Sequence, residues 1–528
     1  MNTPHFTHLV FLEPSDVLFF RDGRPMTGGL AGHGAAWPLP NVINAAFHGA
    51  LHRADLEQLT GKKVHPHHHP GRDGKRAGEA NHRPRKFGSL LTAGPFPVSV
   101  ATAPALDAAA GTSPDARSRW FFPRPADLLL GDNCSRLQIA LRPAAPADQW
   151  SPKKHSSLPA PLSLAVGNCL PPSKETGVFQ WLEQTAYHNY LSENFKDPLP
   201  QHAHLNDDSI FAAEFTVGIG IDPATQTQDG EHIYSAHYLR LRSEWRLGVV
   251  AACLDKGTTE NASPRDLLAE LLPDRRGQVL DTDGQPSPAD DAVARIIVGG
   301  QQRLCSAVRD PAPQLPLPRG LSRGFHIKGT GHEKRCFVKW ILLTPAIWPK
   351  IPAKSKLGEP MVPHPGGWLP NWVFINWDAS AQETKFHVEQ GKVLLAHRSG
   401  AISRNYSGPK ARRVAEFEEK INAFLVAALV PKAIPVTGWS LQVPAVSDSE
   451  AGAKTTHLAV PAGAIYYFET RGPNAEVEAR KLAAALNWHG EVRNTPADFT
   501  TIKNRRSTLA GEKGFGLGVC GTWTPHNA

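Results

Sequence analysis

The sequence predicts an α+β fold built in two similar halves. Strand-like apolar runs alternate with amphipathic helices, and each half reads strand, helix, strands, helix, glycine turn and strand, as in a diverged duplication. The chain has 528 residues, 41% of them hydrophobic, whereas a single core stops growing at about 250–300 residues. The proline-rich segment 311–320 is typical of a linker. We therefore expect an N-terminal domain over 1–310 and a C-terminal domain over 321–528.

The first half opens with a strand, a glycine-rich loop and a helix. Residues 7–12 form the apolar run of a strand, and a polar loop with several glycines follows over 21–34. In 40–55 apolar residues recur four positions apart, which predicts an amphipathic helix docked on a core. Apolar runs within 211–252 flank an Asp-Pro and Asp-Gly turn region, which predicts a β-hairpin with a long tip. Ser263 is the expected N-cap of a short helix.

The second half repeats this order. Strands are expected over 336–343 and 463–468, and a helix over about 412–430, where apolar residues fall on one face before a proline. The alanine-rich segment 475–486 predicts another helix, with alanines and leucines on its buried side. The chain then ends in GEKGFGLGVCGTW, a glycine turn followed by a strand.

The net charge of +8 favours a polyanionic partner. Most of it comes from 62–86, where eight Lys/Arg stand against two Asp/Glu and almost nothing is apolar, so this segment predicts a mobile loop. Long insertions are expected at about 60–118 and 254–292. Six cysteines without a CxxC pair exclude a disulfide scaffold and a thiolate zinc ribbon. With no signal peptide and no membrane-length apolar stretch, a soluble, cytoplasmic protein is expected.

The glycine-rich segment near the C-terminus is the most informative local signal. Glycines at every second position allow backbone N–H groups to approach an anion or a sugar-phosphate chain closely. The segment is neither a Walker A loop nor a dinucleotide fingerprint, because it contains no Gly-Lys-Ser/Thr and a strand, not a helix, comes next. The alternative is a tight turn before the final strand, with the upstream cations on a solvated face. The candidate anion-binding residues are Lys503, Arg505, Arg506, Gly514, Gly516 and Gly518.

Catalytic and metal-binding motifs are weak. No GxSxG, HExxH or P-loop pattern is present. His33 could serve as a general base, but a loop histidine that donates one hydrogen bond is the favoured interpretation. The run 65–69 contains four histidines, and His48 and His52 have helical i, i+4 spacing, yet neither group has a partner carboxylate or cysteine at useful spacing. We therefore predict no metal, no cofactor and no enzymatic activity.

Taken in order, several segments resemble the RAMP superfamily of CRISPR proteins and, within it, subunit three of the type III-B (Cmr) effector complex. The resemblance does not cover 60–118 or much of 254–292 and 352–435. The matching segments are VFLEPSDVLFFRDGRPM, NAAFHGALHRA, RWFFPRPADLLL, FTVGIGIDPATQTQDGEHIYSAHYLRL, IIVGGQQR, WILLTPAIW, VPAGAIYYFE and GEKGFGLGVCGTW.

The resemblance implies two tandem ferredoxin-like (RRM-related) domains and a non-catalytic subunit that grips the 5′ handle of the crRNA. It also implies two protein neighbours, the large cyclase/polymerase-like subunit and the first backbone RAMP subunit. It assigns the RNA to the first glycine-rich loop and to the C-terminal glycine segment with its upstream cations. A single-stranded handle is held through phosphates, with bases against aromatic faces. The residues added on this ground are Arg21, Arg24, Gly28, Gly29 and, on the first helix, His48.

Two other functions remain open from the sequence. A metal-independent crRNA-processing endoribonuclease of the same superfamily would need a histidine, tyrosine or lysine set around a kinked RNA backbone. A protein–protein scaffold would carry its basic charge only for solubility.

Overall fold

The computed structural model describes most of the chain between Thr7 and His526. The described residues are 7–526 apart from 24–30, 33, 54–89, 101–117, 131–136, 145–161, 170–178, 196–201, 256–263, 282–283, 289–293, 313, 353–362, 376–390, 397–419, 441–451, 454 and 492–494.

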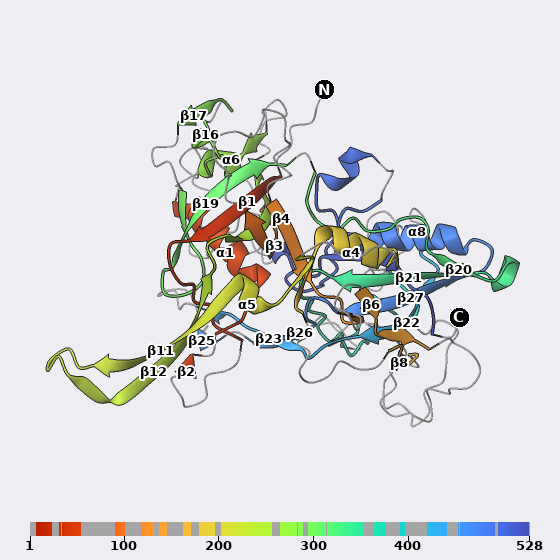
Figure 1. Cartoon of the computed structure of the whole chain (residues 1–528), viewed down its shortest axis with the longest axis horizontal. Helices are drawn as coiled ribbons and strands as arrows, with labels where there is room; N and C mark the ends of the chain where they lie inside the picture. The colour runs from red at the N-terminus through yellow and green to blue at the C-terminus, as the bar shows by residue number, and fades with distance from the viewer. Residues whose placement is uncertain are drawn as a thin grey trace.

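The first half is built on an eight-stranded antiparallel sheet with the order β10-β9-β4-β3-β13-β1-β19-β18, drawn on the left of Figure 1. Strand β1 alternates its apolar side chains between two faces. Its Val10 and Leu12 lie under helix α1, while Leu9 and Phe11 point toward the second half. The strands are β1 (His8–Pro14), β3 (Leu91–Val100), β4 (Ser118–Pro123), β9 (Trp181–Glu183), β10 (His204–Leu205), β13 (Trp245–Ala252), β18 (Ala294–Ile297) and β19 (Leu304–Pro311).

Helix α1 (Pro40–Arg53) covers one face of this sheet, as its sequence period predicts. Ile43, Phe47 and Leu51 are fully buried in the core that α1 shares with the short helix α6 (Leu267–Leu271).

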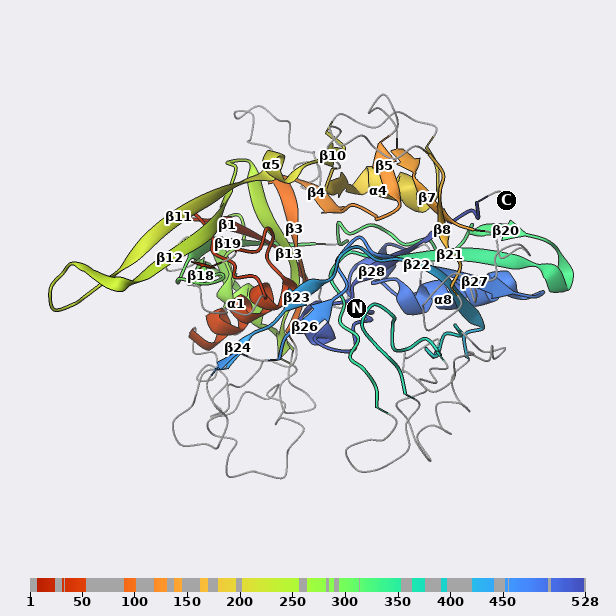
Figure 2. The ribbon, with the colours of Figure 1, turned by 90° about the horizontal axis from the view of Figure 1, so that it is seen from below.

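The second half has a five-stranded sheet with the order β20-β21-β27-β22, in which β28 also pairs with β21. Helix α8 (Ala475–Leu486) covers one face with the alanines and leucines that the sequence predicts as buried. Figure 2 shows α1 beside the first sheet and α8 beside the second, with the β23–β26 ribbon between them. The strands are β20 (His326–Lys328), β21 (Arg335–Leu342), β22 (Ala423–Leu429), β27 (Ile465–Arg471) and β28 (Gly518–Thr522).

The two sheets share one hydrophobic core. Phe11 and Phe96 of the first half belong to the same buried cluster as Phe337, Tyr467 and Trp523 of the second, and helix α4 (Gln184–Leu191) contributes to it. We call the junction between residues 7–312 and 314–526 the seam. The halves therefore bury much of each other's inner sheet faces at the seam.

The linker crosses this junction as packed chain. Leu315 and Leu317 are buried, and two histidines accept hydrogen bonds from its backbone. The Arg319 N–H donates to His188 Nε2 (2.7 Å) and the Gly320 N–H to His489 Nε2 (3.0 Å). Burial lowers the pKa of His188 to about 4 and that of His489 to about 3, so both rings are neutral acceptors at neutral pH.

A buried ionic cluster joins the halves beside the linker. Lys339 of β21 is fully buried, with Nζ 3.9 Å from Asp127 Oδ2 and 4.0 Å from Glu193 Oε1. Asp127 accepts hydrogen bonds from the hydroxyl groups of Tyr190 (2.7 Å) and Tyr467 (2.9 Å). Burial raises the pKa of Asp127 and lowers that of Lys339, and their mutual attraction opposes both shifts.

The predicted hairpin is confirmed. Strands β11 (Phe211–Ile221) and β12 (Gln228–Leu241) form a ribbon that projects from the body at the lower left of Figure 1. Short ribbons and turns complete the described fold, in which no helix is long and apolar enough to cross a membrane. They are β2 (Ala31–Gly32), β5 (Leu128–Leu130), β6 (Leu137–Ile139), β7 (Leu141–Pro143), β8 (Ala165–Gly167), β14 (Leu254–Asp255), β15 (Arg265–Asp266), β16 (Gln278–Leu280), β17 (Pro286–Pro288), β23 (Ile434–Val436), β24 (Trp439–Ser440), β25 (Gly452–Ala453), β26 (His457–Ala459), α5 (Asp207–Ile210), and the 3₁₀ turns Gly331–Glu333, Pro496–Phe499 and Gly511–Lys513.

The mixed, strand-rich architecture agrees with an α+β class, and two local predictions were wrong. The helix expected over 412–430 is replaced, in its described part, by strand β22, because its apolar run is paired to β27 and buried from both sides. The short helix begins at Leu267, where the Asp266 carboxylate accepts the Ala269 N–H (3.1 Å), so Asp266 and not Ser263 is the N-cap. The basic segment 62–86 lies outside the described residues.

Candidate nucleic-acid interface

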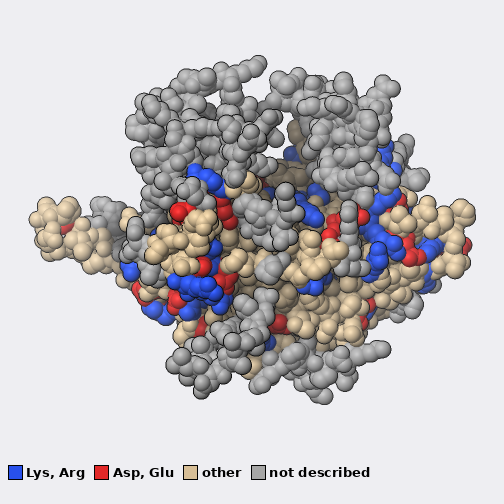
Figure 3. Space-filling model, turned by 90° about the horizontal axis from the view of Figure 1, so that it is seen from above, with Lys and Arg blue, Asp and Glu red and all other residues tan. Residues whose placement is uncertain are grey.

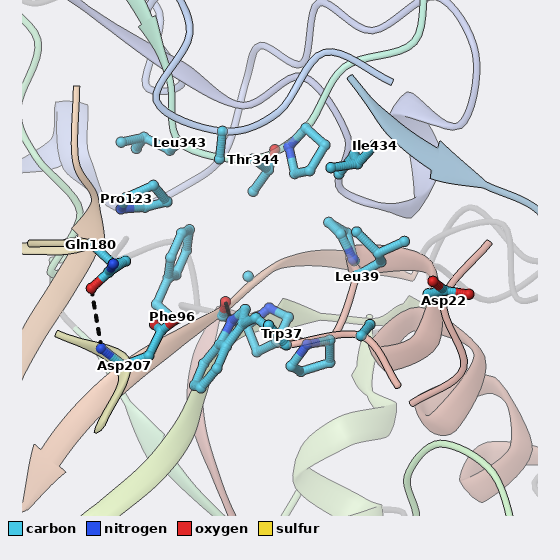
Figure 4. A pocket seen from close by; sticks show the side chains of 18 of the residues that line it. Asp22, Trp37, Leu39, Phe96, Pro123, Gln180, Asp207, Leu343, Thr344 and Ile434 are labelled. Carbon is cyan, nitrogen blue, oxygen red and sulfur yellow. Dashed lines mark hydrogen bonds between the residues drawn. The ribbon is translucent and has the colours of Figure 1, made fainter. Parts of the chain in front are cut away.

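A cavity of about 440 Å³ opens at the seam where the first glycine-rich loop meets the second half. We call it the seam pocket; Figure 4 shows it from close by. It is lined by Asp22, Gly23, residues 34–40, residues 94–96, Pro123, Gln180, Trp181, Asp207, residues 343–345, Ile434, Pro435 and Ala462.

Aromatic side chains build one wall of the seam pocket. The Trp37 indole N–H donates to the Pro95 carbonyl oxygen (2.9 Å), and the Trp37 ring meets that of Trp181 edge to face, with centroids 5.1 Å apart. Phe96 stands beside Trp37 in Figure 4, across the cavity from Leu343. Because a hydrogen bond and the Trp181 ring hold Trp37, and Phe96 is buried against Phe122, the wall is rigid before any ligand arrives.

One end of the pocket is polar. Asp207 Oδ1 accepts the Trp181 indole N–H (2.7 Å), and the Asp207 backbone N–H donates to Gln180 Oε1 (3.3 Å). Burial raises the pKa of the Asp207 carboxyl, while the hydrogen bond from Trp181 opposes that rise. Among the described residues neither Asp207 Oδ2 nor Gln180 Nε2 has a hydrogen-bond partner, so this end presents an acceptor next to a donor.

The opposite wall is held by the C-terminal glycine segment. Thr344 Oγ1 donates to the Gly514 carbonyl oxygen (2.8 Å) and accepts the Leu517 N–H (2.9 Å). The Gly516 N–H donates to the Pro345 carbonyl oxygen (2.7 Å). The segment predicted to bind an anion therefore supports the lining of the seam pocket from behind.

The three glycines of this segment approach the protein's own chain. A Cβ atom would lie 2.6 Å from the Thr92 carbonyl oxygen at Gly514 and 2.1 Å from the Ser507 backbone nitrogen at Gly516. At Gly518 it would lie 2.4 Å from the indole nitrogen of Trp340. Gly514 and Gly516 also have left-handed φ values of +93° and +76°. The space that the sequence argument reserves for RNA is thus filled by internal contacts at these three positions.

The first glycine-rich loop reaches the same junction. Arg21 is exposed, and a Cβ on Gly23 would lie 2.3 Å from the Pro435 carbonyl oxygen in the second half. The other predicted residues of this loop fall outside the described residues; they are Arg24, Gly28, Gly29 and His33.

The three cations upstream of the C-terminal segment differ in their surroundings. Lys503 is exposed. Arg505 is half-buried and donates to the Glu512 carbonyl oxygen (3.1 Å), and desolvation lowers its pKa. Arg506 donates to the Ala485 carbonyl oxygen in the last turn of α8 (2.5 Å), and burial lowers its pKa to about 10. Arg506 therefore caps the C-terminal end of α8, while Lys503 and Arg505 remain the cations nearest solvent.

Histidines form no metal site in the part of the chain that the structure describes, where no group of three potential ligands occurs. His48 is half-buried on α1, the His52 side chain and the 65–69 run lie outside the described residues, and His48 has a partner of its own.

A second, more open cavity of about 510 Å³ adjoins the first along the seam. It shares Pro123, Gln180 and Ala462 with the seam pocket and adds Arg124 and Phe179. The Arg124 guanidinium lies 5.7 Å from the Phe179 ring centroid. On the described part of the face in Figure 3, basic and acidic side chains lie together in several mixed groups and do not form one positive stripe.

Sequence reasoning missed the residues that line the seam pocket. Trp37, Phe96, Trp181 and Asp207 come from four separate segments, and no spacing rule connects them. The available signal was the recurrence of aromatic residues next to proline, as in Trp37-Pro38, which marks rigid apolar chain at element ends.

A family model described as "CRISPR-associated protein (Cas_Cmr3)" matches residues 10–523 of the chain. Among solved structures, a chain of "Cryo-EM structure of the Type III-B Cmr-beta bound to cognate target RNA" is 13% identical, covers 87% of this chain and 86% of its own, and has a TM-score of 0.31. A chain of the same complex with AMPPnP, state 1, is 12% identical over the same shares, with a TM-score of 0.30. No curated protein matches the sequence.

Proposed function

Because this chain belongs to the CRISPR-associated Cas_Cmr3 family, subunit three of the type III-B (Cmr) effector complex, we propose that it holds the 5′ handle of the crRNA along its seam. The family match over nearly the whole chain is the observation that carries the proposal. It agrees with the resemblance implied by the order of the sequence motifs.

The grip is proposed to act mainly on phosphates. Arg21 and Arg24 of the first loop, together with Gly28 and Gly29, would meet the RNA from one half. Lys503 and Arg505 would meet it from the other, while the C-terminal glycines, Arg506 and the α1 residue His48 shape the surface behind them. Support comes from geometry: Gly23 of the first loop and Pro435 of the second half approach each other directly.

Two tandem ferredoxin-like domains, 1–310 and 321–528, are proposed as the architecture around this grip. Each half has an antiparallel sheet with a helix on its outer face, which supports the proposal. The proposed neighbours are the large cyclase/polymerase-like subunit and the first backbone RAMP subunit. In this assembly the chain binds RNA and does not cut it.

The test compares two crRNAs that differ only in the handle. Dissociation constants are measured at several salt concentrations for crRNA with its handle and for the same guide without it. We expect tighter binding of the first, and Arg505→Gln reduces that preference. Arg276→Gln, at an exposed arginine in the turn that precedes β16, is the matched control and leaves it unchanged.

Equal binding of both RNAs contradicts the handle assignment. Incubation of the purified chain with unprocessed repeat RNA, with and without divalent metal, adds the second readout. Cleavage of that RNA would replace the binding role with the endoribonuclease function.

A further inference from the structure

We propose that the seam pocket receives one unstacked RNA base that carries an amino group. This inference rests on the proposed function and adds to it a place where a single base of the bound strand is read.

The size and walls of the seam pocket fit a flat ring. Its volume of about 440 Å³ lies in the range of pockets that enclose small molecules, and a helix or duplex would not enter it. The half-buried Trp37 offers an aromatic surface on one side, with the buried Phe96 next to it, and Leu343, Thr344 and Ile434 close the other side in Figure 4. Stacking on such a face stabilises a single-stranded base in a way that tolerates sequence.

The polar end adds discrimination. Asp207 Oδ2 can accept from an exocyclic amino group, while Gln180 Nε2 can donate to a neighbouring ring nitrogen or carbonyl oxygen. Adenine, cytosine and guanine each carry an amino group beside an acceptor or a second donor, whereas uracil has no amino group. The geometry at Asp207 therefore favours those three bases over uracil.

The charge distribution assigns the phosphate to the outside. Among the described lining residues of the seam pocket there is no Lys or Arg, and the carboxylates of Asp22 and Asp207 would repel an anion within it. Arg124 lies in the adjoining cavity, which shares Gln180 and Ala462 with the pocket. A nucleotide in this orientation places the amino group of its base beside the Asp207 carboxylate and its anionic phosphate beside the Arg124 cation.

The experiment scans a short single-stranded handle RNA with one abasic nucleotide at each position in turn. Wild-type chain should lose about tenfold in affinity at one position and little at the others. Asp207→Asn should lower the affinity for the intact RNA by about tenfold. It should not change the affinity for the RNA that is abasic at that position. Asp208→Asn makes the same charge change on an exposed neighbour outside the pocket and should change neither.

Two further arms separate the outcomes. Replacing the base at the sensitive position by uracil should weaken binding about as much as Asp207→Asn does. Ala36→Phe, which fills the pocket from an exposed lining position, should abolish the sensitivity while the chain keeps its melting temperature.

If the chain binds the handle RNA but the effect of Asp207→Asn depends on no nucleotide position, the base pocket is overturned while the proposed function stands. Absence of handle binding by the wild-type chain overturns both. If Ala36→Phe leaves RNA affinity unchanged but prevents association with a protein subunit of the complex, the pocket receives a protein side chain and the inference fails.

Discussion

The buried lysine at the seam gives the sharpest stability prediction. Lys339→Met removes a fully buried cation from a cluster in which Asp127 and Glu193 are largely shielded from water and in which Arg142 is paired with Glu193. The methionine fits the volume of the lysine stem, so packing changes little while the charge disappears. Asp127 then keeps its hydrogen bonds from Tyr190 and Tyr467 but loses its positive neighbour at 3.9 Å.

The expected cost follows from that separation. Two unit charges at 4 Å interact by about 4 kcal/mol at an effective dielectric constant near 20. Loss of one member of a buried pair destabilises by about 3–5 kcal/mol, since the charge of the other member stays buried without that attraction. Lys339→Met should therefore lower the free energy of unfolding by about that amount. Asp127→Asn should cost less in the Lys339→Met background than alone, by about 2–3 kcal/mol of coupling.

Urea unfolding of the two single variants and the double variant measures this cycle, followed by far-ultraviolet circular dichroism and tryptophan fluorescence together. Lys334→Met is the control, because Lys334 pairs with Glu476 at the surface and should cost no more than about 1 kcal/mol. If the two single costs add to within about 0.5 kcal/mol, Lys339 and Asp127 do not interact and the electrostatic reasoning is refuted.

Four further outcomes are expected. Arg505→Gln should modestly weaken binding of the handle RNA and lower the slope of log affinity against log salt concentration by about one, as measured by filter binding. An unchanged slope would show that Arg505 contacts no phosphate. Gly516→Ala should lower the melting temperature of the RNA-free chain, because the new Cβ would lie 2.1 Å from the Ser507 backbone nitrogen and φ is +76°. An unchanged melting temperature would show that the turn can relax. Since the native pKa values of His188 and His489 lie below the unfolded value near 6.5, stability is complete above that pH. In urea titrations the free energy of unfolding should fall between pH 6.5 and pH 4, by up to about 1.4 kcal/mol per pH unit for each histidine. His489→Gln should make that fall less steep. Deleting 62–86 should leave the melting temperature unchanged and reduce the salt dependence of RNA binding by a few phosphate equivalents, whereas aggregation of the deletion would show a structural role.

Local sequence patterns predicted the elements whose burial follows a simple period. Helix α8 matches its predicted bounds because its alanines and leucines repeat on one face. The strand β22 was mistaken for a helix, since a short run such as Ala423–Leu429 has apolar residues at both helical and strand spacings. Only its pairing with β27, a contact distant in sequence, decides between them.

The candidate site was less predictable for a related reason. The sequence singled out loops rich in glycine, and those loops do reach the seam, as the contact of Gly23 with Pro435 demonstrates. It did not indicate that Gly516 faces Ser507, nor that Trp37 and Asp207 line one cavity. Such facts depend on how two sheets pack together, and no single segment encodes that packing.

The position of β1 in the first sheet bears on how the chain folds while it is synthesised. This strand lies between β13 and β19, whose residues are 245–252 and 304–311. At about 5–20 residues per second, a ribosome needs on the order of 15–60 s after β1 to complete β19. Strand β1 thus leaves the exit tunnel as a central strand with both neighbours still to be translated. For most of the time spent on its first half, the nascent chain carries β1 with two open edges.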